Sequence, residues 1–434
     1  MLTASKEAIE RLIDDVEYLW TAPISNISDE GDPYIDNNSG TSNSNIDVYD
    51  HPPSALHFLR HHVAASRPCL IRNAMPADLR TLSLAELLSQ WPDDLPTIQV
   101  DVTPDGHGDC LRRVTRTASS SLAPREAAAD SPTHPVHENN DAEFLFAKPM
   151  ECEMSISEFC EALKLHKGAR GDTDPLSVVK TRIFPRDDTA IRTDSDDGDD
   201  IDSGVDKGKD ECNGIPTLPP PHEAVFYYSR QNDCFRTELK PLWDKLQLPR
   251  TLDWAAQAFD APEPDAVNLW IGGPQAVSAM HKDHYENLFH VWCGTKVFTL
   301  VPPAYAPLLG ERLVPSGRFV WNEQEKQWKV KSDVTADGTV ETVQWVTVDV
   351  TRQPSSSTTS SSTELPVPPF RQVRVQAGEM LYLPALWYHG VSQCGDITMG
   401  VNYWYDMKFE SPLWAYFHFL QQMQPTEDAP VKQN

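Results

Sequence analysis

The chain has 434 residues, an apolar fraction of 40% and a formal net charge of −27 at pH 7. This length allows one large domain or two ordinary ones, and the apolar fraction is enough for a sizeable buried core. Because phosphate binding needs clustered Lys and Arg, 37 such residues against 64 acidic ones argue against a nucleic-acid surface and favour a basic protein partner.

Eight cysteines are scattered along the chain without a CxxC pair. This spacing predicts neither a zinc framework nor a disulfide scaffold, and reduced thiols are typical of cytosol and nucleus. The N-terminus lacks a basic segment followed by an apolar run, and no stretch approaches the roughly 18 apolar residues needed to cross a bilayer. We therefore expect a soluble protein of the cytoplasm, the nucleus or both, without membrane association.

The N-terminal region, residues 1–50, is predicted to be one helix followed by a disordered acidic loop. Residues 5–20 place apolar side chains at helical spacing, and we expect this helix to pack on the domain rather than to bind a partner. Residues 23–50 are rich in Asn, Ser, Asp and Gly, so they have too little apolar surface to order themselves. A single domain is expected over residues 51–434.

Short strands and helices follow, separated by a first insertion. Strands are predicted at 67–73 and 97–102, and helices at 82–91 and 155–163. Residues 117–140 lose all periodicity and fill with Ser, Ala, Pro, His and Asn, which is typical of an insertion rather than of a core segment.

Two further insertions are predicted at 187–221 and 351–366. From Asp187 to Glu211 eleven acidic residues stand against three basic ones, with few apolar residues between them. This composition indicates a disordered tether, and steering of a basic substrate towards the site is the alternative interpretation. The third insertion surrounds a Ser/Thr run.

Periodicity becomes dense after Pro221. Strands are predicted at 224–228, 266–271, 372–376, 380–384 and 398–405, and helices at 239–248, 252–258 and 409–423. Residues 289–292 and 296–301 are expected to form a β-hairpin around Cys293-Gly294-Thr295. The apolar surface of the C-terminal helix 409–423 fits either a core or a homodimer interface. Many short strands with few helical crossovers predict a mainly β fold of the jelly-roll kind, surrounded by helices.

Two histidines and an aspartate form a candidate metal centre. Residues two apart in a strand point to the same face, so His281 and Asp283 can ligate one ion while Lys282 points away. His389 can supply a third ligand if an antiparallel roll brings it opposite this pair. Two imidazoles and one carboxylate make the facial triad of non-haem Fe(II) oxygenases, which leaves positions for oxygen and a chelating cosubstrate. His-x-Asp alone arises by chance, so its context must support it.

Three sequence blocks supply that context, at residues 281–288, 377–387 and 401–407. Through them the sequence resembles the JmjC-domain, cupin-like Fe(II)- and 2-oxoglutarate-dependent oxygenases, and among these the protein lysyl (3S)-hydroxylases. Weaker similarity extends through residues 67–73 and 102–106. The resemblance implies a double-stranded β-helix, or jelly-roll, core, with iron on His281, Asp283 and His389.

The resemblance also implies a 2-oxoglutarate pocket. Lys296 would pair with the distal carboxylate, since an unpaired buried ammonium is costly. Tyr227, Ser278 and Asn287 match positions that donate hydrogen bonds to that carboxylate or line its pocket, although relatives commonly have Thr where this chain has Ser278. The implied cosubstrates are 2-oxoglutarate and O2.

Two residues near the C-terminus belong to the same implied pocket. Asn402 matches a position near the metal-binding end. Trp404 either packs beside the cosubstrate or is a plain core aromatic.

No Ser/His/Asp or Cys/His arrangement is supported by spacing, so no catalytic residue is expected beyond the metal ligands.

The implied reaction is (3S)-hydroxylation of lysine in a protein, with developmentally regulated GTP-binding proteins as the substrate class. An acidic enzyme suits a lysine-bearing partner. The alternatives are demethylation of N-methyl-lysine in histones, proteolysis of histone tails, and a non-enzymatic cupin-like scaffold. A scaffold would be expected to have lost a triad residue or Lys296, and all four are present.

Overall fold

The computed structural model describes residues 2–4, 6–21, 46–114, 143–165, 218–351 and 367–425. The predicted insertion 117–140 lies outside these ranges, as do residues 187–217 and 352–366 of the other two. Whether these segments are tethers therefore stays a prediction.

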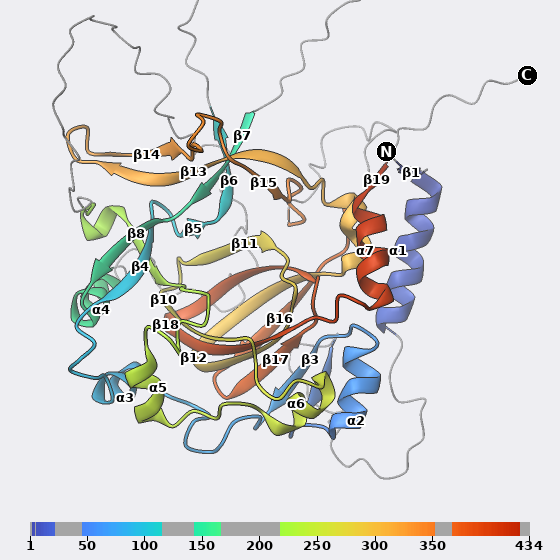
Figure 1. The fold of residues 1–434 in the computed structure, drawn as a ribbon, viewed down its shortest axis with the longest axis horizontal. Coiled ribbons are helices and arrows are strands. Elements are labelled where there is room, and N and C mark those ends of the chain that lie inside the picture. Colours follow the sequence, from blue (N-terminus) through green and yellow to red (C-terminus); the bar gives the residue numbers. More distant parts are fainter. Residues whose placement is uncertain are drawn as a thin grey trace, which may run out of the picture.

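A strongly bent β-sheet forms the centre of the molecule (Figure 1). Within the described ranges it contains twelve strands, ordered β2-β3-β17-β12-β18-β10-β9-β4-β8, with β16 on β12, β11 on β18 and β5 on β11. The strands are β2 (Asp47–Tyr49), β3 (Cys69–Arg72), β4 (Ile98–Thr103), β5 (His107–Gly108), β8 (Met150–Met154), β9 (Val225–Tyr228), β10 (Ala266–Gly272), β11 (Val277–His281), β12 (Tyr285–Val301), β16 (Arg371–Gln376), β17 (Glu379–Leu383) and β18 (Tyr388–Asp406).

The long strands β12 and β18 are shared by two halves of this sheet. They pair antiparallel from Tyr285 opposite Asp406 to Val301 opposite Tyr388. The first half of β12 also pairs with β17 and its second half with β16, whereas β18 pairs with β11 near its start and with β10 near its end. Because β12 and β18 run through both halves of the sheet, the halves fold over each other and close a jelly-roll core.

The predicted hairpin at 289–301 is wrong, because this stretch is one continuous strand, β12. Gly294 has φ +73°, and the register with β18 shifts on both sides of Cys293. A Cβ on Gly294 would lie 2.3 Å from Oγ1 of Thr398, so only glycine fits this bend. The Cys-Gly turn signal marks a β-bulge that bends the strand without reversing it.

A second sheet lies beside the jelly roll, at the top of Figure 1. Its order is β14-β13-β7-β6, with β15 on β13. The strands are β6 (Cys110–Val114), β7 (Glu143–Lys148), β13 (Arg312–Asn322), β14 (Gln327–Ser332) and β15 (Thr342–Trp345). The sequence analysis predicted none of these strands. In β13 the apolar alternation is interrupted by Pro315-Ser316-Gly317, which hides the period-2 pattern.

Helices cover the outer face of the jelly roll and bury a large apolar cluster against it. They are α2 (Ala55–Phe58), α3 (Leu84–Ser89), α4 (Ile156–Leu165), α5 (Lys240–Leu246) and α6 (Asp253–Phe259), with short turns η2 (Leu59–Val63) and η6 (Pro221–Glu223). The predicted helices at 82–91, 155–163, 239–248 and 252–258 are thus confirmed. In α3 a capping box between Ser83 and Glu86 satisfies backbone donors of the first turn.

The first and last described segments of the chain lie together at one side of the roll. Helix α1 (Lys6–Thr21) and helix α7 (Pro412–Gln421) flank η7 (Pro303–Leu308), and β1 (Leu2–Ala4) pairs in parallel with β19 (Met423–Pro425). Ile9 of α1 is buried in an apolar cluster with Tyr305 and Phe417. The prediction that the N-terminal helix packs on the domain is therefore confirmed.

Part of the predicted loop 23–50 is wrong, because Asp47–Tyr49 form β2, which pairs in parallel with β3. The prediction for residues 23–45 lies outside the described residues.

Helix α7 buries Phe417 but leaves Tyr416 67% and Phe419 51% exposed, so a homodimer through this helix stays a prediction. Among the helices of the described ranges, none has the length and apolar composition required to cross a bilayer. The described cysteines, which exclude Cys212, are all free thiols.

Candidate metal and cosubstrate site

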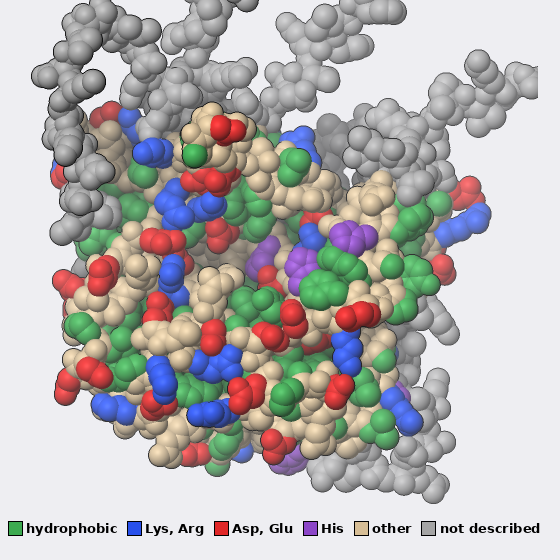
Figure 2. Space-filling view, in the orientation of Figure 1, with side chains coloured by type: hydrophobic (Ala, Val, Ile, Leu, Met, Phe, Trp, Pro, Cys, Tyr) green, Lys and Arg blue, Asp and Glu red, His purple; other side chains and the backbone are tan. Residues whose placement is uncertain are grey.

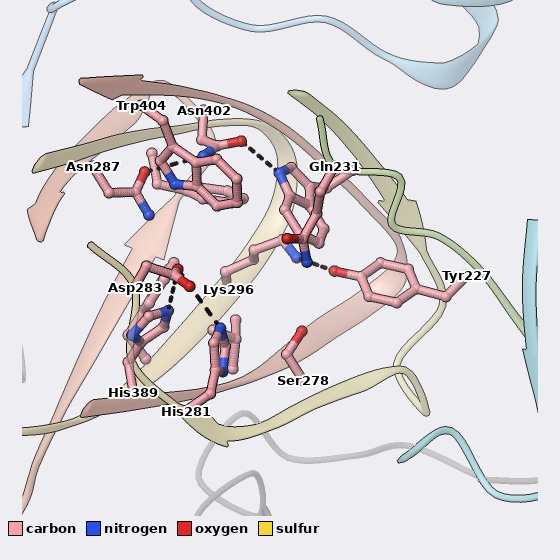
Figure 3. Close-up of a pocket in the computed structure, with 14 residues that line it drawn as sticks. Tyr227, Gln231, Ser278, His281, Asp283, Asn287, Lys296, His389, Asn402 and Trp404 are labelled. Carbon is pink, nitrogen blue, oxygen red and sulfur yellow. Dashed lines mark hydrogen bonds and ion pairs between the residues drawn. The ribbon is translucent and has the colours of Figure 1, made fainter. Parts of the chain in front are cut away.

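One pocket inside the jelly roll collects every residue that the sequence analysis assigned to the site (Figure 3). Its walls come from β9, β10, β11, β12 and β18, together with the segments that follow β9 and β11. The predicted residues in it are Tyr227, Ser278, His281, Asp283, Asn287, Lys296, His389, Asn402 and Trp404.

The three predicted ligands lie together at one side of this pocket. His281 ends β11 and stands opposite His389 of β18 in the strand register. The Asp283 carboxylate lies 3.7 Å from Nε2 of His281 and 3.6 Å from Nε2 of His389. All three potential ligand atoms fall within 4.8 Å of one another. Asp283 itself lies in the short connection after β11, so the turn rather than strand alternation aims its carboxylate at the histidines.

Both histidines present the same nitrogen to the shared space. Nδ1 of His281 donates to the carbonyl of Ala279 at 2.7 Å, and Nδ1 of His389 donates to the carbonyl of Trp387 at 3.0 Å. A carbonyl only accepts, so Nδ1 carries the proton and each Nε2 keeps a lone pair that faces the space shared with Asp283. Burial lowers the pKa of His389 to about 4, which keeps this imidazole neutral at pH 7. Two imidazoles and a carboxylate fit Fe(II) or a similar divalent ion.

Lys296 projects into the pocket from the second half of β12. Its side chain is only 2% exposed, and Nζ donates to the hydroxyl of Tyr227 at 2.9 Å. Nζ also lies 5.2 to 5.7 Å from the ring centroids of Tyr227, Trp270 and Phe289. Within the described ranges no carboxylate pairs with it, and burial lowers its pKa from 10.5 to about 7. A buried ammonium without a counter-charge is suited to bind an anion.

Two hydroxyl groups stand near this ammonium. Tyr227 comes from β9 and Ser278 from β11. Burial raises the pKa of the Tyr227 hydroxyl, and the neighbouring Ser278 hydroxyl partly offsets this rise. Both hydroxyls therefore stay protonated at neutral pH and can donate to a carboxylate beside Lys296.

Two amides and an indole line the opposite wall. Oδ1 of Asn402 accepts from Nε1 of Trp270 at 2.8 Å, and its Nδ2 donates to Oδ1 of Asn287 at 3.3 Å. Trp404 stacks on Tyr285 with ring centroids 4.8 Å apart and an interplanar angle of 5°. Its buried Nε1 has no hydrogen-bond partner, so Trp404 serves as packing and also offers the pocket a free donor.

Five pocket residues were missed by the sequence analysis: Gln231, Trp270, Phe289, Phe298 and Val391. Strand alternation could have found three of them, because Phe289, Phe298 and Val391 lie two residues after Asn287, Lys296 and His389, respectively. Gln231, in the segment after β9, carries no comparable signal. The second sheet contributes Trp345, whose ring lies 6.3 Å from the His281 imidazole at an interplanar angle of 6°.

Comparison with known proteins supports the fold around this site. A family model described as a cupin-like domain matches residues 54–411, a range that includes the whole pocket. The chain belongs to the cupin-like JmjC family. This membership agrees with the jelly-roll core and confirms the family resemblance drawn from the three sequence blocks.

Three JmjC relatives match nearly the full chain. The protein named lysine-specific demethylase JMJ32 from Arabidopsis thaliana is 30% identical over 87% of this chain and 86% of its own length. The bifunctional peptidase and (3S)-lysyl hydroxylase JMJD7 from Homo sapiens is 28% identical over 87% of this chain and 89% of its own length. JmjC domain-containing protein E from Dictyostelium discoideum is 25% identical over 85% and 86%, respectively.

Proposed function

We propose that the protein is an Fe(II)- and 2-oxoglutarate-dependent oxygenase that acts on lysyl residues of a protein substrate. The product would be (3S)-hydroxylysine. One observation supports the oxygenase assignment above all others. A single pocket holds the His281, Asp283 and His389 group together with the buried Lys296 ammonium, which has no carboxylate partner in the described part of the chain. A dicarboxylate that chelates a metal through one end suits both features.

The side chains of the pocket have distinct tasks in this proposal. His281, Asp283 and His389 would hold Fe(II), which supplies the redox chemistry when bound. Lys296 pairs with the far carboxylate of 2-oxoglutarate, and the hydroxyls of Tyr227 and Ser278 donate to the same group. Overall, 2-oxoglutarate and O2 become succinate and CO2 while one substrate C–H becomes C–OH.

Cosubstrate binding is coupled to the protonation of Lys296. With a pKa near 7 in the cosubstrate-free pocket, this amine is about half protonated at neutral pH. A carboxylate beside Nζ favours the ammonium, so binding raises this pKa and holds the proton on Nζ. Affinity for 2-oxoglutarate is therefore expected to fall as pH rises above 7.

A basic protein substrate suits the charge of the chain. The net charge is −27, although both acidic and basic side chains border the hollow at whose edge histidines gather in Figure 2. The negative electrostatic field of a chain with this net charge favours the approach of a lysine-bearing partner. The human relative is named a (3S)-lysyl hydroxylase, which supports lysyl hydroxylation here, with developmentally regulated GTP-binding proteins as the first substrates to test.

Demethylation of N-methyl-lysine is the second candidate. It is supported by the Arabidopsis relative, whose name describes a lysine-specific demethylase and which is 30% identical to this chain. The same metal and cosubstrate would oxidise an N-methyl group of the substrate lysine, in place of the β-methylene of its side chain. The two candidates differ in substrate, not in the residues of the pocket.

Mass spectrometry separates these activities. The iron-loaded protein is incubated with 2-oxoglutarate and O2, together with lysine-containing peptides of GTP-binding proteins or N-methylated histone peptides. A gain of one oxygen supports hydroxylation, loss of a methyl supports demethylation, and shortened peptides indicate a peptidase. His281→Ala should abolish turnover, whereas His222→Ala, at an exposed site in η6, should not. Full turnover by His281→Ala would contradict the proposal.

A further inference from the structure

Lys282 lies between two proposed ligands, yet its side chain leaves the pocket. Its ammonium bonds to the Glu311 carboxylate, and the two side chains are only 15% and 7% exposed. Nζ of Lys282 also lies 5.1 Å from the ring centroid of Tyr388, which directly precedes His389 in β18. The sequence neighbours of all three ligands therefore meet at one buried ion pair.

Two further elements hold Glu311 from other directions. Nε2 of Gln421, the last residue of α7, donates to the carboxylate at 2.7 Å, and Nε2 of Gln344 in β15 donates at 3.4 Å. Gln344 precedes Trp345, the residue whose ring lies parallel to the His281 imidazole. Glu311 thus joins the ligand segments to the C-terminal helix and to the second sheet.

Stability does not explain this arrangement well. Apolar residues of similar volume often replace a buried ion pair without loss of stability, so such a pair is weak evidence for a stabilising role. Neither Lys282 nor Glu311 lines the pocket, so neither touches a bound cosubstrate. Both surround Tyr388, whose buried hydroxyl has its pKa raised by burial and then by the charge of Glu311. What the pair does constrain is the backbone on both sides of the ligands.

We propose that Glu311 is a positioning residue for the metal centre. By holding Lys282 and the Tyr388 segment, it fixes the directions of the His281, Asp283 and His389 side chains, and it ties them to α7 and β15. This inference rests on the proposed metal site. Partners outside the ligand set commonly change metal affinity by about 10- to 100-fold when they are removed.

Titration of Co(II) into the metal-free full chain tests this inference without any turnover. Affinity is measured by calorimetry, and ligand geometry by the visible absorption of the bound Co(II). Lys282→Met and Glu311→Gln should each weaken Co(II) binding by about 10- to 100-fold. The double variant should bind no more weakly than the worse single variant, because the two residues act as one unit.

A matched control is Lys329→Met in β14, which also removes a buried lysine paired with a glutamate, here Glu325 at 3.0 Å. Its Co(II) affinity should stay within about twofold of the parent protein, since Lys329 lies in β14 and Glu325 in the turn before it, outside the segments that carry the ligands. Thermal unfolding of each metal-free variant reports on folding separately from metal binding.

The outcomes distinguish this inference from the proposed function. If the parent chain does not bind Co(II), or if His281→Ala binds it equally well, the metal site itself is wrong. If His281→Ala abolishes binding but Lys282→Met and Glu311→Gln bind like the parent, only the positioning role is overturned. If both single variants fail to fold, the Co(II) affinity of Gln421→Leu tests the positioning role instead. This variant removes one hydrogen-bond donor to Glu311 and leaves the ion pair intact. Several-fold weaker binding supports the inference, and unchanged binding overturns it.

Discussion

Replacing Lys296 with Met should have two opposite effects, one on stability and one on cosubstrate binding. Burial lowers the pKa of this amine from 10.5 to about 7. At about 1.36 kcal/mol per pKa unit, holding the ammonium in the cosubstrate-free pocket costs on the order of 5 kcal/mol. Met fills the space of the lysine stem without this charge. We therefore expect the metal-free variant to unfold at a higher temperature than the parent protein at pH 7.

The pH dependence of this effect has a defined sign. Between about pH 7 and pH 10.5 the unfolded chain holds a proton on Lys296 that the folded protein lacks. The free energy of unfolding of the parent therefore falls as pH decreases through this window, and the full penalty is reached below pH 7. Lys296→Met removes this contribution, so its stabilisation should be largest near pH 7 and vanish above pH 10.5.

Cosubstrate binding should change in the other direction. A hydrogen bond to a charged group contributes about 1.5 to 3 kcal/mol, so its loss should weaken 2-oxoglutarate binding by about 10- to 100-fold. Calorimetry with the Mn(II)-loaded protein measures this. In the parent the dissociation constant should rise about tenfold per pH unit above 7, and Lys296→Met should lack that slope.

Lys331→Met, at an exposed position of β14, serves as the control and should leave both stability and binding unchanged. The reasoning about Lys296 would be refuted by a Lys296→Met variant that binds 2-oxoglutarate with the affinity and pH slope of the parent. The gain in melting temperature of the variant over the parent should be larger at pH 7 than at pH 10. The opposite order would contradict the assigned cost of the buried ammonium.

Three further changes have expected outcomes. Tyr227→Phe removes the acceptor 2.9 Å from Lys296 and a donor to the cosubstrate, so the KM for 2-oxoglutarate should rise about 2- to 10-fold in a succinate assay with little change in melting temperature. Gly294→Ala puts a Cβ 2.3 Å from Oγ1 of Thr398 at φ +73°, and urea unfolding should show a loss of about 1–3 kcal/mol. Chelation of metal should abolish oxygen transfer to the peptide, and added Fe(II) should restore it in the same mass assay.

Local patterns in the sequence predicted the helices around the jelly roll and several of its strands. The run 266–271 reads as a buried strand, and β10 is buried along its whole length. The run 82–91 has helical periodicity, and α3 lies within it. Such features depend on residues within one or two turns of each other, so a short window of sequence contains their cause.

Elements defined by distant partners were not predictable in the same way. Cys293-Gly294-Thr295 fits a hairpin turn as well as a bulge, and pairing with β18 along the whole of β12 decides between them. The second sheet was missed because β13 finds its partners in β7, β14 and β15, and one of these lies more than a hundred residues upstream. Strand pairing is a non-local interaction that periodicity alone does not encode.

The sequence by itself determined the chemistry of the site: two histidines and an aspartate in the ligand motifs, and one lysine after the glycine that bends β12. Only the tertiary structure decided how these groups meet. The register of β11 against β18 sets His281 opposite His389, and closure of the roll leaves Lys296 buried without a carboxylate partner in the described part of the chain. Residue types fix which interactions a side chain can make, whereas burial and neighbours, which arise from packing between distant strands, fix which of them it makes.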